Sequence, residues 1–346
     1  MKTAIVTGTN GYLGMAICRR LIDDTPKNQA LRIVATSRTF RTVISAVKEL
    51  QAYVHSAHPN RPANIEFDYL LFDQCNMVSI LAAAREIRLR YPKVDYFFFN
   101  SSYSSMGGID YAQACKDFFT QPIKAFTVGT FKIQGPVRKT QDGMGAAFQA
   151  NVFGPYYLAM AILPSLQNAK GKLIWISSSI SLPEYFDIND IGVENSLHSY
   201  EASKYVLELL HLAIYQKLLD SGVESWLLQP GVFKSTTFVP TLNFISYFGM
   251  ILMFYICRMF GSPYHCIWPE VAANAPLYLA LQADPKKDPQ NIKYGSGTSR
   301  WGTPVLMRTP MNPPASHVSA VYDYVNALKE NWDEKLADQI VERVNY

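Results

Sequence analysis

The sequence predicts an α/β protein whose single domain is built on a Rossmann-type, doubly wound parallel sheet. Short apolar strands alternate with amphipathic helices from the first residues onward, and a glycine-rich turn, residues 7–14, follows the first strand. A later helix carries Tyr200 and Lys204 four positions apart. Strands that alternate with helices form parallel sheets covered by helices on both faces. Such sheets bind ligands at the carboxyl ends of their strands.

Composition narrows the class of protein. The chain has 346 residues, of which 49% are hydrophobic and 17% charged, so it can bury a large core. Its net charge of +4 comes without a basic run, and no nucleic-acid partner is expected. The five cysteines form no C-x-x-C pair, which favours a reducing compartment. His198 and His265 have no metal-ligand spacing, so no metal site is expected, and the strand starting at Thr3 argues against a signal peptide.

The first unit consists of a strand over residues 3–6, the glycine turn and a helix over residues 15–22. Gly8, Gly11 and Gly14 have the spacing G-x-x-G-x-x-G. Glycines let the backbone approach a pyrophosphate, which then sits at the N-terminus of the following helix. The unit therefore predicts a dinucleotide site, and an ordinary glycine turn is the alternative.

The second predicted strand, residues 31–36, indicates which dinucleotide. It ends at Thr36 and is followed by Ser37, Arg38 and Arg41. A cofactor with a free ribose 2′-hydroxyl favours Asp or Glu at this point, whereas hydroxyls and arginines suit a 2′-phosphate. We therefore expect NADP(H) rather than NAD(H). The alternative is that the arginines only decorate a solvated helix start.

The alternation continues through the middle of the chain. The expected helices cover residues 43–53, 78–90, 145–163 and 200–219, and the expected strands cover residues 67–72, 94–99, 172–176, 224–228 and, as the last strand of the sheet, 291–295. Asp73 follows one strand, where it would accept from an adenine amino group or cap the next helix. Residues 101–143 do not fit the pattern and are typical of a functional loop or a partner surface.

Tyr200 and Lys204 are the candidate reactive pair. Residues four apart on a helix lie on one face, one turn apart. A cation beside a phenol lowers the phenol pKa from about 10, so we expect Tyr200 to exchange a proton near neutral pH. A half-buried tyrosine with a surface lysine is the alternative.

With these pieces in order, the chain resembles the short-chain dehydrogenase/reductase family. The matching elements are TGTNGYLG, Asn100, Asn151, the serines at 177–179, YEASK and PGVFKST, which span residues 3–236. Three features depart from the common pattern: Tyr12 in the glycine turn, Asn100-Ser101-Ser102-Tyr103 after the fourth strand, and a gap of 22 residues from Ser178 to Tyr200. Because of this gap, the choice of Ser178 among the three serines rests on its distance from the strand.

The resemblance implies roles for individual residues. Tyr200 would give a proton to a ketone oxygen as hydride arrives, Lys204 would lower the Tyr200 pKa and hold the nicotinamide ribose, and Ser178 would hydrogen-bond the developing alkoxide. Asn151 would hold a water that links Lys204 to solvent, or be an ordinary helix asparagine bonded to a carbonyl. The implied cofactor-binding positions are Gly8, Asn10, Gly11, Leu13, Gly14, Thr36, Ser37, Arg38, Asp73, Asn100, Tyr200, Lys204, Val232, Ser235 and Thr236.

At finer grain the chain resembles the yeast-type 3-keto-steroid reductases of sterol C-4 demethylation. The features are FDYLLFD, FQANVFGPYY, the apolar block LNFISYFGMILMFY and the tail WDEKLADQIVE. This resemblance implies NADPH-dependent reduction of a sterol 3-ketone to the 3β-hydroxyl in ergosterol biosynthesis, at the cytosolic face of the endoplasmic reticulum membrane and on lipid droplets. It also implies oxidosqualene cyclase and C-4 demethylation enzymes as partners. The alternatives are reduction of another lipid ketone and a scaffold that stabilises such partners.

The apolar block sets the expected organisation of the domain. Residues 238–257 carry no charge, a length in the range of a membrane span. Pro240 and Gly249 interrupt the block, and a strand of the sheet is expected after it. Both observations favour a helix pair that lines the substrate pocket and inserts into one leaflet of the membrane. The alternatives are a buried lid over the substrate and a helix that spans the membrane. We expect a reductase core over residues 1–237 and 270–300, this lid or membrane segment over 238–269, and an amphipathic helical extension over 301–346.

Overall fold

The computed structural model describes residues 1–59, 64–235 and 244–341, and its centre is one large sheet. Within these residues eight strands pair in the order β12-β11-β8-β7-β4-β1-β2-β3, all parallel except β12, which runs antiparallel to β11. Their bounds are β1 Lys2–Val6, β2 Leu31–Ser37, β3 Ile65–Leu71, β4 Tyr96–Phe99, β7 Lys172–Ile176, β8 Glu224–Gln229, β11 Ile292–Thr298 and β12 Pro304–Pro310. The predicted doubly wound α/β fold is confirmed.

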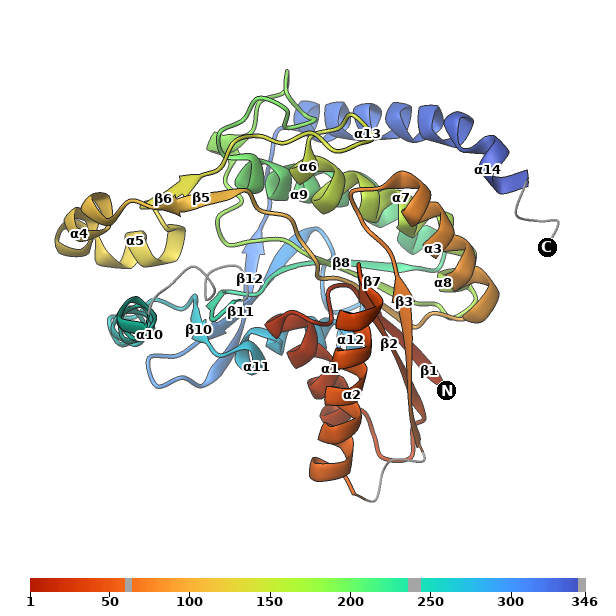
Figure 1. The fold of residues 1–346 in the computed structure, drawn as a ribbon, viewed down its shortest axis with the longest axis horizontal. Coiled ribbons are helices and arrows are strands. Elements are labelled where there is room, and N and C mark those ends of the chain that lie inside the picture. Colours follow the sequence, from red (N-terminus) through yellow and green to blue (C-terminus); the bar gives the residue numbers. More distant parts are fainter. Residues whose placement is uncertain (60–63, 236–243, 342–346) are drawn as a thin grey trace.

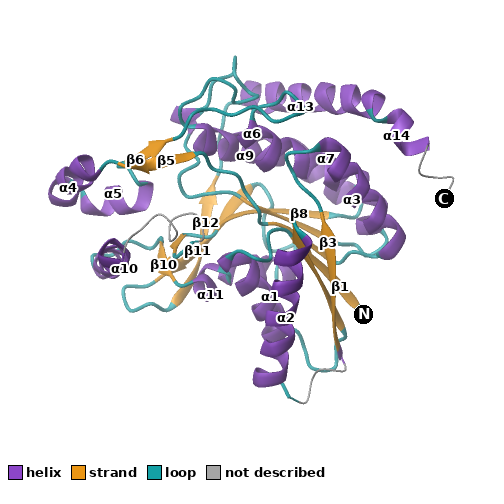
Figure 2. Cartoon of the chain, viewed as in Figure 1, coloured by secondary structure: helices purple, strands orange, loops and turns teal. Residues whose placement is uncertain are grey.

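Helices cover both faces of the sheet (Figures 1 and 2). One face carries α1 Tyr12–Asp24, α2 Phe40–Ala57, α11 Pro269–Ala272 and α12 Asn274–Leu281. The other carries α3 Met77–Arg90, α7 Gly154–Ala161, α8 Leu163–Gln167 and α9 Ser199–Asp220. The central strands β4 and β7 are buried on both faces and are therefore largely apolar, as in the YFFF sequence of β4. Phe99 and Trp175 stack across β4 and β7 with ring centres 4.4 Å apart.

The C-terminal part departs from expectation. The interpretation of residues 291–295 as the last strand is wrong, because β12 adds an antiparallel edge strand after β11. Glycine and proline have low strand propensity, and they occur at Gly295 and Gly297 in β11 and at both ends of β12. Strand propensity alone therefore does not predict this hairpin. After it, α13 Ala315–Lys335 packs against α9, and α14 Ala337–Val341 follows.

The helix expected over residues 145–163 is interrupted. It begins as α6 Ala146–Phe148, widens into a π-helix over Gln149–Phe153 and continues as α7. A π-helical turn inside a helix often marks a functional site, and this one carries Asn151.

The 101–143 segment is not irregular. It folds into a two-stranded ribbon of β5 Met106–Ile109 and β6 Lys132–Gln134. The segment that connects the two strands forms the helices α4 Tyr111–Thr120 and α5 Pro122–Val128. In Figure 1 this unit projects to one side, above α10 Phe244–Met259. The short strands β9 Val232–Phe233 and β10 His265–Ile267 pair beside α10.

Of the apolar block, the structure describes one helix, α10, and its expected helix partner would include residues that lie outside the described part. No helix of the described chain has both the length and the apolar character needed to cross a membrane.

Candidate active site

The glycine turn is held against the second strand by hydrogen bonds. Gly8 has a φ of +65°, a left-handed conformation that glycine adopts freely, and its N–H donates to Thr36 Oγ1 at 3.2 Å. Thr9 Oγ1 donates to Val6 O at 2.8 Å and accepts from Thr36 N at 3.1 Å. The helix that follows, α1, has Gly11 as its N-cap residue, and no side-chain cap bonds the first N–H groups of the helix. This arrangement suits an anion such as pyrophosphate.

Asn100 and Gly14 close the turn from the other side. Asn100 Nδ2 donates to Thr7 O at 2.8 Å, and Asn100 N donates to Thr7 Oγ1 at 2.8 Å. A Cβ on Gly14 would lie 2.4 Å from Gly8 O and 3.0 Å from Asn100 Nδ2. These two predicted residues therefore shape the turn, and only glycine fits at position 14.

A cavity of about 1060 Å³ runs from this turn to α10. Most of the predicted site residues line it: Gly8, Asn10, Gly11, Leu13, Thr36, Ser37, Arg38, Asp73, Asn100, Ser178, Tyr200, Lys204, Val232 and Ser235. Gly14 and Asn151 do not line it, and Thr236 lies outside the described residues. The structure thus brings together side chains from nearly 230 positions of sequence in one cavity.

Arg38 and Asp73 lie at the carboxyl ends of β2 and β3, at the glycine-turn end of the cavity. Asp73 does not cap α3, since the cap is Asn76, whose side chain accepts from Ser79 N at 2.8 Å. Asp73 Oδ1 instead accepts from Cys75 N at 2.9 Å. The capping alternative for Asp73 is wrong, and its carboxylate lines the cavity.

Tyr200 and Lys204 lie on one face of α9, with the lysine Nζ 5.8 Å from the centre of the tyrosine ring. The expectation that the ammonium lowers the phenol pKa is wrong in this structure. Burial raises the pKa of Tyr200 to about 12, and the hydroxyls of Ser178 and Ser102 partly oppose that rise. Lys204 is itself buried and donates to Ile176 O at 2.7 Å. Its burial lowers the lysine pKa to about 7, against the opposing charge of Glu208.

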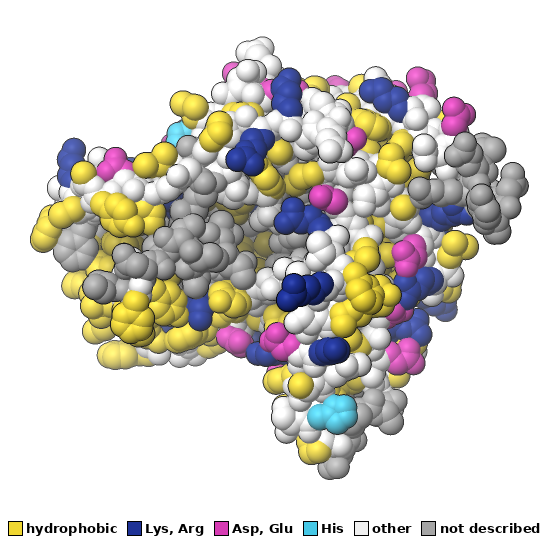
Figure 3. Space-filling view, in the orientation of Figure 1, with side chains coloured by type: hydrophobic (Ala, Val, Ile, Leu, Met, Phe, Trp, Pro, Cys, Tyr) yellow, Lys and Arg dark blue, Asp and Glu magenta, His cyan; other side chains and the backbone are white. Residues whose placement is uncertain are grey.

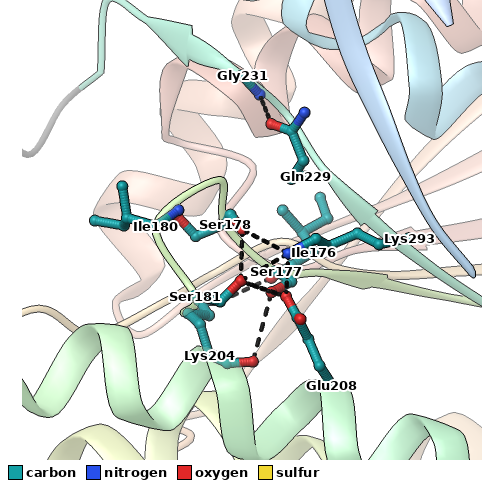
Figure 4. Close-up of polar contacts among 10 residues, drawn as sticks. All are labelled: Ile176, Ser177, Ser178, Ile180, Ser181, Lys204, Glu208, Gln229, Gly231 and Lys293. Atoms are coloured by element: carbon teal, nitrogen blue, oxygen red, sulfur yellow. Dashed lines mark hydrogen bonds and ion pairs between the residues drawn. The ribbon is translucent and has the colours of Figure 1, made fainter. Parts of the chain in front are cut away.

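Between Ser177 and Ser178, the geometry favours Ser178 (Figure 4). Its Oγ accepts from Ile180 N at 3.3 Å, which leaves the hydroxyl hydrogen available as a donor. A hydrogen bond from the Ser178 side chain also lowers the pKa of the Tyr200 phenol, against the larger effect of burial. Ser177 Oγ instead donates to Glu208 Oε1 at 2.6 Å and is 2% exposed, so it is already engaged.

Asn151 has a structural task in the described contacts. Its Oδ1 accepts from Tyr103 N at 2.7 Å, and its Nδ2 donates to Tyr103 O at 2.9 Å and to Ser203 Oγ at 2.9 Å. It therefore connects the loop after β4 to the helix that bears Tyr200. The relay to Lys204 through water stays a prediction.

The predicted lining of the pocket by a helix of the apolar block is confirmed by α10, but sequence reasoning missed that the β5–β6 unit forms the same far end of the cavity. Its lining comes from the β5–β6 unit and from α10: Ile109, Ala114, Phe126, Phe131, Met250, Met253, Phe254 and Ile256. The two segments meet where Cys257 Sγ approaches Pro122 O at 3.8 Å. The length of the 101–143 segment signalled a functional loop, but no local pattern pairs it with a helix more than 100 residues later.

Comparison with known proteins now identifies the family. The family model described as short chain dehydrogenase matches residues 2–243. The chain belongs to the short-chain dehydrogenase family. Among curated relatives of this short-chain dehydrogenase, the 3-keto-steroid reductase ERG27 of Saccharomyces cerevisiae is 44% identical, over 99% of this chain and 98% of that protein. The 3-keto-steroid reductases of Kluyveromyces lactis and Candida albicans are 42% and 40% identical over 98% of this chain and 97% and 96% of their own lengths. The family predicted from the sequence is confirmed.

Solved structures agree on the fold of the short-chain dehydrogenase. The NADPH-bound carbonyl reductase from chicken fatty liver has a TM-score of 0.53 at 17% identity, covering 88% of this chain and 98% of that one. A short-chain type dehydrogenase/reductase from Mycobacterium ulcerans has a TM-score of 0.53 at 15% identity, covering 81% and 83%.

Proposed function

We propose that this short-chain dehydrogenase is an NADPH-dependent 3-keto-steroid reductase that converts a sterol 3-ketone to the 3β-hydroxyl during C-4 demethylation in ergosterol biosynthesis. The observation that carries the proposal is the 40–44% identity, over nearly the whole chain, to proteins named 3-keto-steroid reductase. The cavity supports it, because Tyr200 and Ser178 lie between the glycine turn and an apolar end built from aromatic and Met side chains.

The residues fit NADP(H). The glycine turn and the uncapped start of α1 suit the pyrophosphate. The end of β2 offers Thr36, Ser37 and Arg38, a set that suits a 2′-phosphate better than a free hydroxyl. Leu13 and Asp73 would line the adenosine, and Val232 with Ser235 would cover the nicotinamide carboxamide. When bound, the cofactor supplies hydride to the substrate carbonyl carbon.

The raised pKa of Tyr200 suits reduction. A phenol with a pKa of about 12 carries its proton at neutral pH, so Tyr200 can donate that proton to the carbonyl oxygen as negative charge develops there. Ser178 donates a hydrogen bond to the same oxygen. Lys204 lies on the same face of α9, beside the Tyr200 ring, and would hold the hydroxyls of the nicotinamide ribose there.

We further propose that the outer face of α10 (Phe244, Phe248 and Met259) docks on the cytosolic leaflet of the endoplasmic reticulum membrane and on lipid droplets. These side chains are 54–77% exposed, while Met253 and Phe254 on the inner face are buried against the cavity. Trp301 is 88% exposed on the turn beside Gly302, which approaches Arg258 of α10. Figure 3 shows hydrophobic side chains gathered over this region. A sterol could then pass from a leaflet into the cavity without crossing water.

Vesicle binding tests the docking. Phe244→Glu with Phe248→Glu should abolish sedimentation with phosphatidylcholine–phosphatidylserine vesicles, because two charges would enter the apolar layer. Leu89→Glu is the matched control, since Leu89 is 74% exposed on α3. Equal sedimentation of both variants would contradict the docking surface.

Oxidosqualene cyclase and the C-4 demethylation enzymes are proposed as partners on the strength of the family resemblance alone. The projecting β5–β6 unit, with Tyr111 and Phe119 exposed, is the surface to test. Phe119→Ser should reduce copurification of a tagged cyclase and leave ketone reduction unchanged, because Phe119 does not line the cavity. Undiminished copurification would remove this surface from consideration.

NADPH oxidation by the purified protein tests the substrate. We expect turnover of a 4-desmethyl 3-keto sterol, with a 3β-hydroxysterol as product, and turnover at least about tenfold lower, per kcat/KM, with retinal or a long-chain aliphatic ketone. Preference for the non-steroid ketone would overturn the sterol assignment and leave the reductase assignment standing. Absence of turnover with every ketone, together with cyclase binding, would favour a scaffold.

A further inference from the structure

A buried ion pair lies next to Ser178 but outside the cavity. Lys293 of β11 and Glu208 of α9 are 12% and 6% exposed at their side chains, and Lys293 Nζ lies 2.8 Å from Glu208 Oε1. Neither residue lines the cavity. Figure 4 shows both side chains converging on the loop after β7. Nothing in the proposed reduction uses this pair.

The Lys293 ammonium is fully bonded, and its bonds lead to Ser178. Lys293 Nζ donates to three acceptors: Glu208 Oε1, Ser181 Oγ at 2.9 Å and the Ser178 carbonyl at 3.4 Å. An ammonium has three donors, so the set is complete. Ser181 Oγ also contacts the Ser178 carbonyl at 2.7 Å. The peptide of Ser178 is thus held from two sides.

The same pair reaches the helix that bears the reactive tyrosine. Glu208 follows Lys204 by one turn of α9, so both face the end of β7. Glu208 Oε1 accepts from Ser177 Oγ at 2.6 Å, and it lies next to Ser181 Oγ, whose single hydrogen is shared between this oxygen and the Ser178 carbonyl. Ser177 Oγ in turn approaches Lys204 O at 3.5 Å. One carboxylate oxygen therefore connects β7, the loop after it, α9 and β11.

Such a pair is an expensive way to obtain stability. Removing two charges from water costs several kcal/mol per ion, and apolar residues of similar volume often stabilise a fold as well or better. What charged hydrogen bonds add is direction. Here the charged hydrogen bond orients the backbone carbonyl of Ser178. The side chain of Ser178 lines the cavity, and its hydroxyl hydrogen is available as a donor.

We propose that Lys293 and Glu208 are positioning residues for the reduction: they fix the Ser178 peptide so that its hydroxyl points at the substrate carbonyl oxygen beside Tyr200. The pair touches neither substrate nor cofactor and acts only through Ser178. This inference rests on the proposed reduction and deepens it. A displacement of about 1 Å at a reacting group can cost about 100-fold in rate, so a small shift of this loop suffices.

A double-mutant cycle with Ser178 tests the proposal, using kcat for ketone reduction by the full chain. Lys293→Met should lower kcat about 10–100-fold, with the NADPH dissociation constant, read by cofactor fluorescence, changed less than about twofold. In the Ser178→Ala background the same substitution should change kcat less than about twofold, because the hydroxyl it positions is gone. Lys293→Arg should restore part of the loss, since a guanidinium can still donate to the Ser178 carbonyl.

Lys172→Met is the matched control. Lys172 forms a part-buried ion pair with Glu224 at 3.2 Å, at the opposite end of β7 and β8. The Lys172→Met variant should have a lower melting temperature than the wild type and an unchanged kcat. If Lys293→Met prevents folding, Ser181→Ala removes one of the two groups on the Ser178 carbonyl without leaving a buried charge unpaired, and should give the same pattern at about 3–10-fold.

Equal losses of kcat from Lys293→Met in both Ser178 backgrounds would overturn the proposal, as would unchanged kcat in a folded variant. The cycle compares variants on one substrate, so it is read with the 3-keto sterol or with whichever ketone the wild type reduces best. Rejection of the sterol by the wild type would therefore count against the proposed substrate and not against the pairing of Lys293 with Ser178.

Discussion

The two ends of the cavity are built by different interactions. The glycine-turn end, lined by Gly8, Gly11 and Asn100, is closed by hydrogen bonds between backbone and short polar side chains. The apolar end, formed by the β5–β6 unit and α10, is closed by packing of large flexible or aromatic side chains from segments far apart in sequence.

This difference decides how each end responds to change. A hydrogen-bonded turn has one geometry, and an added methyl group has nowhere to go. An apolar surface of methionines and aromatics can repack around a substitution or a differently shaped ligand. The glycine-turn end should therefore set which cofactor binds, and the apolar end should tune which lipid ketone is preferred.

The largest effect is expected where the two ends meet, at Lys204. Burial lowers its pKa from 10.5 to about 7. Between these values the unfolded chain binds more protons than the folded one, so folding stability rises with pH, and below pH 7 the full cost of burial is present. Lys204→Met removes this dependence. Relative to the variant, the wild type should gain on the order of 4 kcal/mol between pH 7 and pH 10, measured by urea denaturation. A constant difference across this range would show that burial does not lower the Lys204 pKa.

Next comes the contrast between two glycines, one at each end. Gly14→Ala would place a methyl 2.4 Å from a backbone carbonyl, and the resulting shift of the turn should weaken NADPH binding about 100-fold, or roughly 3 kcal/mol. Isothermal titration with NADPH measures this.

Gly249→Ala is the matched substitution at the apolar end, where nothing lies within 4 Å of the added methyl. Because alanine is the better helix former by about 1 kcal/mol, α10 should be slightly stabilised and NADPH binding unchanged. Similar losses of NADPH affinity in both variants would remove the proposed difference between the two ends.

The sequence was most informative where chemistry is local. The spacing of the glycines, the hydroxyls at the end of β2 and the four-residue interval from Tyr200 to Lys204 each predicted residues that line one cavity. It was least informative about the apolar end, because the contact between α5 and α10 depends on tertiary packing and leaves no periodic signal. It also misjudged the Tyr200 pKa, because the spacing shows that Lys204 is near but not that burial outweighs it.

Arg38→Ser sharpens the assignment of the glycine-turn end to the 2′-phosphate. Loss of a charge-assisted hydrogen bond costs about 1.5–3 kcal/mol, so kcat/KM with NADPH should fall about 10–100-fold while kcat/KM with NADH stays the same. Steady-state rates with each cofactor measure this. Parallel losses with both cofactors would show that Arg38 supports the fold and not the phosphate.

The smallest effect is expected at the apolar end. Met250→Ala removes part of an apolar side chain that lines the cavity, and at about 0.8 kcal/mol per buried methylene the KM for the sterol ketone should rise about 3–10-fold. The NADPH dissociation constant should not change. A change in NADPH affinity of the same size would mean that the two ends are not separable.

The central claim is that the Tyr200 phenol delivers the proton while hydride reaches the carbonyl carbon. Single-turnover oxidation of bound NADPH with a 4-desmethyl 3-keto sterol, compared between the wild type and Tyr200→Phe, tests it most directly. The account predicts a rate about 10²–10⁴-fold lower in the variant, with NADPH affinity preserved. Equal rates in the two proteins would contradict it.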